Sequence, residues 1–247
     1  MTGWPEGYGR HVFDSVGSTL VEAQRMAPTL AGPAWLLAHE QTAARGRRGR
    51  PWATPRGNFA GTLVLPTDDP PQTAALRSFV ASLALFEAFV AVTGTPQAFA
   101  LKWPNDVLLR GEKVAGILLE TAGRHLIIGI GVNLIAAPGV EEVEAGAVRP
   151  VSLKSALGLT ISPEAFLDAL AAAYAPLEAR FRQSGFAPIR RDWLHHAARL
   201  GEVITARTMR DSWRGRFEDV DENGNLVLST ADGRLAIAAA DVYFDET

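Results

Sequence analysis

The spacing of hydrophobic residues changes along the chain, and each spacing predicts a different kind of structure. Over 72–93 apolar side chains recur every three or four positions, as at Leu76, Phe79 and Leu83, which predicts an amphipathic helix. Further helices are predicted at 19–26, 163–184 and 186–196. Short apolar runs bounded by glycine, proline and polar residues predict strands near residue 11, at 34–41, at 59–66 and three within 100–135. The chain is therefore predicted to begin with alternating helices and strands up to residue 135 and to continue with helices over 163–196.

After residue 200 the pattern changes to four short predicted strands separated by tight turns. The turns are Asp-Glu-Asn-Gly-Asn at 221–225 and Asp-Gly at 232–233, both typical of hairpins. About 50 residues of strands and tight turns favour a small β-barrel. We expect a domain boundary near 198–200.

Composition narrows the functional classes. The chain has 247 residues, 47% of them hydrophobic and 21% charged, which excludes global disorder. It has no cysteine, which excludes thiol catalysis, a cysteine-ligated zinc site and an iron–sulfur cluster. The absence of cysteine also fits a protein of the reducing cytoplasm. With 24 basic and 27 acidic residues the net charge is −3, so any site for a polyanion must be local.

No targeting or membrane-spanning segment is predicted. The first ten residues contain no apolar core of a secretory signal. The longest apolar stretches, 79–92 and 126–137, fall short of the roughly 20 residues that a membrane span needs.

Residues 44–52, Ala-Arg-Gly-Arg-Arg-Gly-Arg-Pro-Trp, form the most unusual segment of the chain. Four of the six residues at 45–50 are arginines and the other two are glycines. Arginine binds phosphate or carboxylate through a fork of donors, and glycine lets the backbone approach a ligand closely. Four clustered positive charges repel one another, so we expect this loop to be mobile until an anion binds. A solvated basic loop or a weak nucleic-acid patch would have the same composition.

A second segment, Lys-Trp-Pro-Asn-Asp at 102–106, interrupts an apolar run. Proline cannot donate a hydrogen bond within a sheet, so we expect a turn or bulge that points short polar side chains at one spot. Lys102 and Asp106 bracket that spot. A carboxylate beside phosphates suits Mg²⁺, although a plain turn with a capping aspartate accounts for the segment equally well.

Two apolar strands carry isolated polar residues. Lys113 begins the segment 113–120, where Gly116 leaves room for a molecule against the backbone. Asn133 follows Gly-Ile-Gly-Val, and a buried asparagine needs partners such as the edge of an adenine. The alternatives are a lysine that extends to water and an asparagine in a turn at the end of a strand.

The remaining candidates are Ser18, Thr19 and Gln41. Hydroxyl and amide groups suit a neutral polar ligand such as a urea. Ser18 is equally suited to be the N-cap of the helix that follows it.

Together and in this order, these segments resemble the biotin protein ligase family, the biotin–[acetyl-CoA carboxylase] ligases. The resemblance is carried by the Ser18-Thr19 pair, Gln41, and the segments 44–52, 102–106, 113–118 and 129–133. It implies an α+β fold: a class II synthetase-like, biotin–lipoate ligase catalytic domain with a mixed sheet and flanking helices over 1–198, and a small SH3-like β-barrel over 199–247. One residue departs from the family pattern, since Ala44 stands where a glycine is usual. A methyl group there is expected to crowd the ligand or restrict φ.

The resemblance implies a reaction in two steps. Biotin and ATP first form biotinyl-5′-AMP and pyrophosphate, and a lysine of the biotin carboxyl carrier domain of acetyl-CoA carboxylase then takes the biotinyl group. Lys113 and Arg47 would be the catalytic residues. The biotin site would consist of Ser18, Thr19, Gln41, Arg45, Gly46 and Gly116. The nucleotide site would consist of Arg50, Trp52, Lys102, Asn105 and Asn133, with Asp106 holding Mg²⁺.

The resemblance also bears on partners. Some family members carry an N-terminal repressor domain, but only about 17 residues precede Ser18, so no DNA binding is expected. A homodimer is left open. Three other functions are weighed: a lipoate or octanoate ligase or transferase of the same fold, a nucleic-acid-binding module that uses 45–50, and a biotin-binding regulator without turnover. Lys113 and Asp106 argue against the last, because binding alone does not require them.

Overall fold

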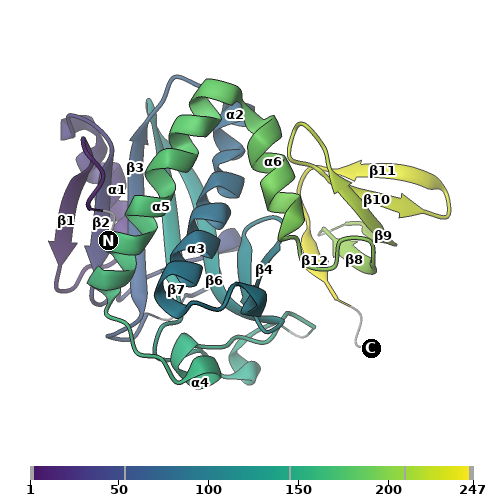
Figure 1. Ribbon diagram of the computed structural model, residues 1–247, viewed down its shortest axis with the longest axis horizontal. Coiled ribbons are helices and arrows are strands. Elements are labelled where there is room, and N and C mark those ends of the chain that lie inside the picture. The colour runs from purple at the N-terminus through teal and green to yellow at the C-terminus, as the bar shows by residue number, and fades with distance from the viewer. Residues whose placement is uncertain (1–2, 53, 145, 209, 245–247) are drawn as a thin grey trace.

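The computed structural model describes residues 3–52, 54–144, 146–208 and 210–244. These residues form two sheets: a large one covered by helices, and a smaller one at the C-terminal end (Figure 1). The strands of the large sheet are β1 (Gly9–Phe13), β2 (Ala34–Ala38), β3 (Phe59–Pro66), β4 (Phe99–Lys102), β5 (Asp106–Leu109), β6 (Glu112–Ala122) and β7 (His125–Val132). The α-helices are α1 (Thr19–Met26), α2 (Pro71–Ala75), α3 (Arg77–Thr93), α4 (Leu153–Leu157), α5 (Pro163–Ser184) and α6 (Phe186–His195). Single 3₁₀ turns lie at Ala27–Thr29, Arg47–Gly49, Pro96–Ala98 and Val140–Glu142.

The large sheet is mixed, with strand order β1-β2-β3-β7-β6-β5-β4. β1 and β2 run parallel, and every other neighbouring pair is antiparallel. A mixed sheet with flanking helices confirms the expected α+β class. The antiparallel pairing of β3, β7 and β6 brings the glycines of these strands next to one another in the middle of the sheet.

Alternating side chains on β2 divide the core between the two faces of the sheet. Trp35 and Leu37 join the main core beneath α3 and α5, whereas Leu36 packs under α1 on the opposite face. The stretch Pro71–Thr93 is long and apolar enough to cross a membrane, yet 61% of its most apolar window is buried inside the protein. That burial is what a core helix requires, and it explains why the segment is apolar on nearly all sides.

The structure corrects four predictions of local structure. Residues 100–135 form parts of four strands rather than three, because the chain turns at 103–105, where Pro104 lacks an amide donor. The C-terminal region has five strands rather than four, because the chain breaks after Ile237 before it forms a last short strand. The helix predicted at 72–93 is divided into α2 and α3, and the five-residue α4 was not predicted.

The C-terminal strands are β8 (Val203–Arg207), β9 (Ser212–Val220), β10 (Leu226–Thr230), β11 (Gly233–Ile237) and β12 (Asp241–Tyr243). They form one antiparallel sheet in the order β11-β10-β9-β8-β12, which is consistent with an SH3-like fold. The turn between β9 and β10 rests on α3: a Cβ on Gly224 would lie 3.0 Å from Phe79 Cε2 of that helix and 2.9 Å from Cδ2 of Leu76, just before it. The indole N–H of Trp103 donates to the carbonyl of Gly224 at 3.0 Å. These contacts fix the smaller sheet beside the segment 102–106.

Candidate active site

One cavity of about 620 Å³ collects all fourteen residues that the sequence singled out. They are Ser18, Thr19, Gln41, Arg45, Gly46, Arg47, Arg50, Trp52, Lys102, Asn105, Asp106, Lys113, Gly116 and Asn133. The cavity also has walls from the loop 138–150 and from β12 of the C-terminal sheet. Residues far apart in sequence thus meet around one space.

The neutral end of the cavity is organised by a chain of hydrogen bonds. Ser18 occupies the N-cap position of α1, but its side chain makes no cap bond and its buried Oγ has no partner among the described residues. Gln41 Oε1 accepts from the backbone N–H of Thr19 at 2.7 Å and from its hydroxyl at 3.0 Å. Thr62, fully buried behind them, donates to Thr19 Oγ1 at 2.8 Å, and Gln41 Nε2 donates to Thr54 at 3.3 Å. The oxygen of the Gln41 amide is therefore occupied by Thr19, and one of its two N–H groups is left for a ligand.

Two lysines and one carboxylate form the charged centre. Lys113 Nζ lies 2.7 Å from Asp106 Oδ1, and Lys102 Nζ lies 3.6 Å from Asp106 Oδ2. Burial lowers the pKa of Lys102, with the carboxylate of Asp106 opposing that effect. Burial alone would raise the pKa of Asp106, but Lys113 and Lys102 outweigh it and hold the pKa below its usual value. Asp106 is thus a carboxylate that lies between the amino groups of two lysines.

The indole of Trp52 lies on the floor of the cavity. A Cβ on Gly131 would lie 2.4 Å from Trp52 Nε1, and one on Gly116 would lie 3.4 Å from Trp52 Cζ3. Lys113 Nζ is 5.5 Å from the centroid of the indole, within reach of a cation–π contact. The glycine at 131 is thus needed because an aromatic ring approaches the strand.

Asparagine side chains serve two different purposes here. The backbone of Asn133 is tied to Val114 and Leu153, while its buried Oδ1 has no hydrogen-bond partner in the described chain. Asn105, by contrast, is already bonded within the protein: its Nδ2 donates to the carbonyl of Ile117 at 2.6 Å, and its Oδ1 accepts from Arg47 at 3.3 Å. Asn133 is therefore the one with an atom free for a ligand, whereas Asn105 positions Arg47.

The arginine loop, defined as residues 44–52, is closed against carboxylates of the protein itself. Arg45 pairs with Glu120 at 2.8 Å. Arg48 pairs with Asp241 at 2.7 Å, and Arg50 pairs with Asp241 at 3.1 Å. Side chains distant in sequence thus neutralise part of the loop's charge, and ordering of the loop by an external anion stays a prediction.

Several polar residues that line this cavity could not be identified from the sequence. Asp241 and Tyr243 come from β12, and Glu144 comes from the loop 138–150. Glu144 accepts a hydrogen bond from the Tyr243 hydroxyl at 3.2 Å and pairs with Arg50 at 2.6 Å. The acidic composition of 136–151 was a usable signal, since a basic loop needs an acidic neighbour. Nothing in the sequence marked Asp241.

The backbone at Ala44 does not require glycine. Outside glycine, the positive φ angles among the described residues belong to Arg48, Arg110 and Arg199. The carbonyl of Ala44 accepts from the N–H of Trp52 at 3.1 Å, so the residue takes part in closing the loop. Ala44 is not among the residues with a positive φ, so the closed loop needs no left-handed backbone at this position.

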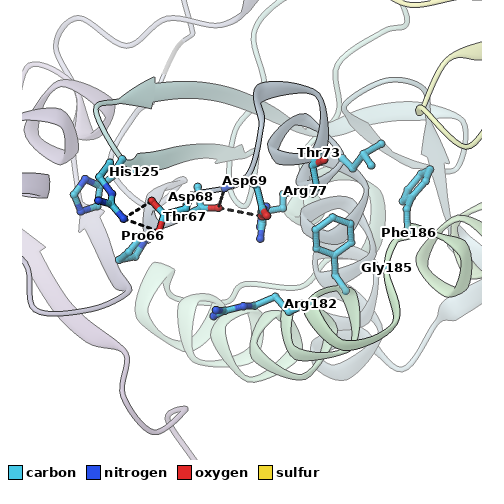
Figure 2. A pocket seen from close by; sticks show the side chains of 13 residues that line it. Pro66, Thr67, Asp68, Asp69, Thr73, Arg77, His125, Arg182, Gly185 and Phe186 are labelled. Carbon is cyan, nitrogen blue, oxygen red and sulfur yellow. Dashed lines mark hydrogen bonds and ion pairs between the residues drawn. The ribbon is translucent and has the colours of Figure 1, made fainter.

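A second cavity, of about 650 Å³, lies where β3 ends and β7 begins and contains none of the predicted site residues. Figure 2 shows its polar side chains directed at one another, with Asp69 joined to Arg77. Arg77 also pairs with Glu178, and Arg124 pairs with Asp68. These charges are already matched within the protein. In the described ranges no three His, Cys, Asp or Glu side chains group as a metal site.

Comparisons with known proteins agree with this geometry. Residues 12–133 match the biotin/lipoate A/B protein ligase family, and residues 200–245 match the C-terminal domain of biotin protein ligases. A biotin–[acetyl-CoA-carboxylase] ligase of Paracoccus denitrificans is 52% identical over 232 residues, covering 92% of this chain and 97% of that protein. A bifunctional ligase/repressor BirA of Bacillus subtilis is 30% identical over 246 residues, covering 96% of this chain and 75% of that protein.

Solved structures share the fold. The biotin protein ligase from Aquifex aeolicus in complex with biotin and ATP has a TM-score of 0.83 at 24% identity, covering 97% of this chain and 99% of that one. The biotin protein ligase from Leishmania major in complex with biotinyl-5-AMP has a TM-score of 0.69 at 23% identity, covering 95% of this chain and 100% of that one. The likeness extends over both sheets.

Proposed function

The chain belongs to the biotin protein ligase family, and we propose that the cavity beside the arginine loop joins biotin to ATP and then passes the biotinyl group to a protein lysine. One observation carries the proposal. The same cavity holds a neutral hydrogen-bonding end at Ser18 and Gln41, a lysine–carboxylate centre at Lys113, and the arginine loop. A ligand with a polar neutral head and a carboxylate tail, placed beside a nucleotide, matches that order.

The neutral end would bind the ureido ring of biotin. Because Thr19 occupies the oxygen of Gln41, the amide offers an N–H to the ureido carbonyl. The Ser18 hydroxyl has no partner among the residues that the structure describes and is free to accept from a ureido N–H. Arg45 and Gly46, at the mouth of the cavity, and Gly116, on its floor, would enclose the ring system and the chain. An alkyl chain alone, as in octanoate, leaves these polar groups without partners, which costs binding energy.

In the first step a carboxylate oxygen of biotin attacks the α-phosphorus of ATP. The bond from that phosphorus to the bridging oxygen breaks, and pyrophosphate leaves with the electron pair. The physical difficulty is that two anions must meet, so positive groups fixed in advance lower the barrier. Lys113 would stabilise the carboxylate and the α-phosphate, and Arg47, held by Asn105, would stabilise charge on the leaving group.

In the second step the ε-ammonium of the acceptor lysine gives a proton to solvent, and the resulting amine attacks the acyl carbon of biotinyl-5′-AMP. The acyl carbon–oxygen bond breaks, AMP leaves with the electron pair, and the nitrogen releases a second proton to solvent as the amide forms. No side chain of this protein has to act as the nucleophile. The closed arginine loop would exclude water, which would otherwise hydrolyse the anhydride.

For the nucleotide we propose that the indole of Trp52 stacks on adenine and that the free oxygen of Asn133 accepts from its amino group. Arg50 and Lys102 would face the phosphates, and Asn105 would act on them through Arg47.

Mg²⁺ takes oxygen ligands and is commonly held by one or two carboxylates together with phosphates. Asp106 supplies one carboxylate at the centre of the cavity, so the donor set fits an ion that enters with ATP. When bound, Mg²⁺ would neutralise phosphate charge. Asp106 is also the carboxylate that orients Lys113 and Lys102.

The name of the Paracoccus relative points to the acceptor. We propose that this chain biotinylates the carboxyl carrier domain of acetyl-CoA carboxylase, in the cytoplasm, where biotin, ATP and that carrier meet. The lack of DNA binding stays a prediction, and dimer formation stays open.

The test is the complete reaction. Purified protein, biotin, ATP and Mg²⁺ are incubated with the carrier domain, and intact-protein mass spectrometry follows the carrier. We expect one added biotinyl group, on one lysine, that depends on both substrates. An unmodified carrier alongside detectable biotinyl-AMP would contradict the proposed acceptor, and a carrier modified with lipoate but not with biotin would contradict the proposed acid.

A further inference from the structure

The C-terminal strand β12 places one carboxylate at the centre of the arginine loop. Asp241 accepts hydrogen bonds from Arg48 at 2.7 Å and from Arg50 at 3.1 Å, and Arg47 lies 3.6 Å from its other oxygen. Three guanidinium groups therefore share a single carboxylate, whose side chain is only 16% exposed. Partial burial strengthens such contacts relative to those on an open surface.

The position of Asp241 is fixed by the rest of the smaller sheet. Its strand pairs with β8, where Asp241 lies opposite Arg207, and the next residue, Val242, is buried. The turn at 221–225 anchors that sheet to α3 and to Trp103. The carboxylate is thus held by the protein scaffold, while the arginines it contacts are on a loop.

Arg48 depends on this contact more than its neighbours do. It is in the left-handed region, with φ of 56°, which is unfavourable for a residue with a side chain. Within the described part of the chain its side chain has no other polar partner than Asp241. Arg50, in contrast, also pairs with Glu144.

We propose that Asp241 is a positioning residue that holds the arginine loop closed over the cavity and so retains biotinyl-5′-AMP until the acceptor lysine arrives. This rests on the proposed function. The phosphates of ATP compete with Asp241 for the same guanidinium groups, which opens the contact while ATP binds. After pyrophosphate has left, the adenylate carries one phosphate charge, and the arginines return to Asp241.

The test compares Asp241→Asn with Asp232→Asn, which removes an exposed carboxylate in the turn between β10 and β11 of the same sheet. Each protein is loaded with labelled biotin and ATP, the complex with the adenylate is isolated, and release is timed after dilution. For Asp241→Asn we expect release roughly tenfold faster, from the loss of three shared charge contacts, and more labelling of lysines on an unrelated protein. The KM for ATP is expected to fall or stay unchanged, because a competing carboxylate is gone.

The inference is overturned if Asp241→Asn releases the adenylate no faster than wild type and Asp232→Asn do. It is also overturned if Asp241→Asn has a raised KM for ATP without faster release.

Two further variants separate a positioning role from a general weakening of the protein. Asp241→Glu is expected to restore slow release in part, and Arg48→Ala is expected to release the adenylate faster without adding to the effect of Asp241→Asn. If wild-type protein forms no adenylate at all, it is the proposed function that fails; normal adenylate formation with unchanged release refutes only the role of Asp241.

Discussion

Thr62 does not line the cavity, yet the structure predicts that it governs the affinity for biotin. Its hydroxyl donates to Thr19 Oγ1, which directs the hydrogen of Thr19 toward Gln41. Replacing Thr62 with valine keeps the shape of the side chain and removes that donor. The Thr19 hydroxyl is then free to rotate, and the amide of Gln41 keeps two of its three hydrogen bonds, from the N–H of Thr19 at 2.7 Å and to Thr54 at 3.3 Å.

The size of the effect follows from the lost hydrogen bond. A buried bond between neutral groups contributes about 1 kcal/mol. If most of that is felt as disorder of the Gln41 amide, the KM for biotin rises roughly threefold to fivefold, since 1.4 kcal/mol corresponds to about tenfold. The kcat at saturating biotin should stay near that of wild type, because Thr62 touches no reacting atom.

The assay is pyrophosphate exchange measured over a range of biotin concentrations at saturating ATP. Ser82→Ala is the matched control, because Ser82 is also a buried hydroxyl that makes two hydrogen bonds, with Phe79 and Trp193, away from the cavity. Both variants are expected to lose about 1 kcal/mol of stability, or roughly 2–4 °C in Tm. If Thr62→Val has an unchanged KM while its Tm falls as far as that of Ser82→Ala, the chain of hydrogen bonds does not orient Gln41 and the reasoning is refuted.

Three further predictions concern the centre, floor and rim of the cavity. Lys113→Ala should lower the rate of adenylation about 100-fold or more with the fold intact by circular dichroism, and near-normal pyrophosphate release would exclude its proposed role. Gly131→Ala adds a Cβ 2.4 Å from the indole of Trp52, whereas the Cβ of Gly116→Ala has its nearest atoms at 3.4 Å. The KM of Gly131→Ala for ATP should therefore rise well above that of Gly116→Ala. Equal values would show that the indole does not cover adenine. Ala44→Gly should leave the KM for biotin within about twofold, because no positive φ is required there; a much lower KM would show that the methyl group crowds the ligand.

The regular elements were largely predictable, because hydrophobic spacing reports on burial directly. The continuous apolar run at 34–38 reflects a strand that is buried on both faces, and the spacing within 72–93 reflects a buried helix. Two of the errors arose where a strand is interrupted, and the other two concern the short helices α2 and α4. Pro104 was recognised as a breaker, yet the residues after it were not assigned to a strand of their own, since four residues carry too little periodicity.

The candidate site was predictable in its members but not in its internal contacts. Lys113 and Asp106 stand out as charges at the edges of apolar runs, and the structure pairs them at 2.7 Å. Thr62 and Asp241 do not stand out, because a threonine in a strand and an aspartate near a turn are ordinary. Their importance comes from which side chain the fold places next to them. Which side chains become neighbours depends on how the two sheets pack, and the sequence alone does not reveal that packing.

The central claim is that this cavity activates biotin with ATP, and the most direct measurement is ATP–pyrophosphate exchange with purified protein and Mg²⁺. Biotin, lipoate and octanoate are tested in parallel, with no acid as the blank. The account predicts exchange that depends on biotin and is near the blank with the other two acids. Exchange with lipoate or octanoate but not with biotin would contradict the assignment of Ser18 and Gln41, and no exchange with any acid by folded protein would contradict the claim itself.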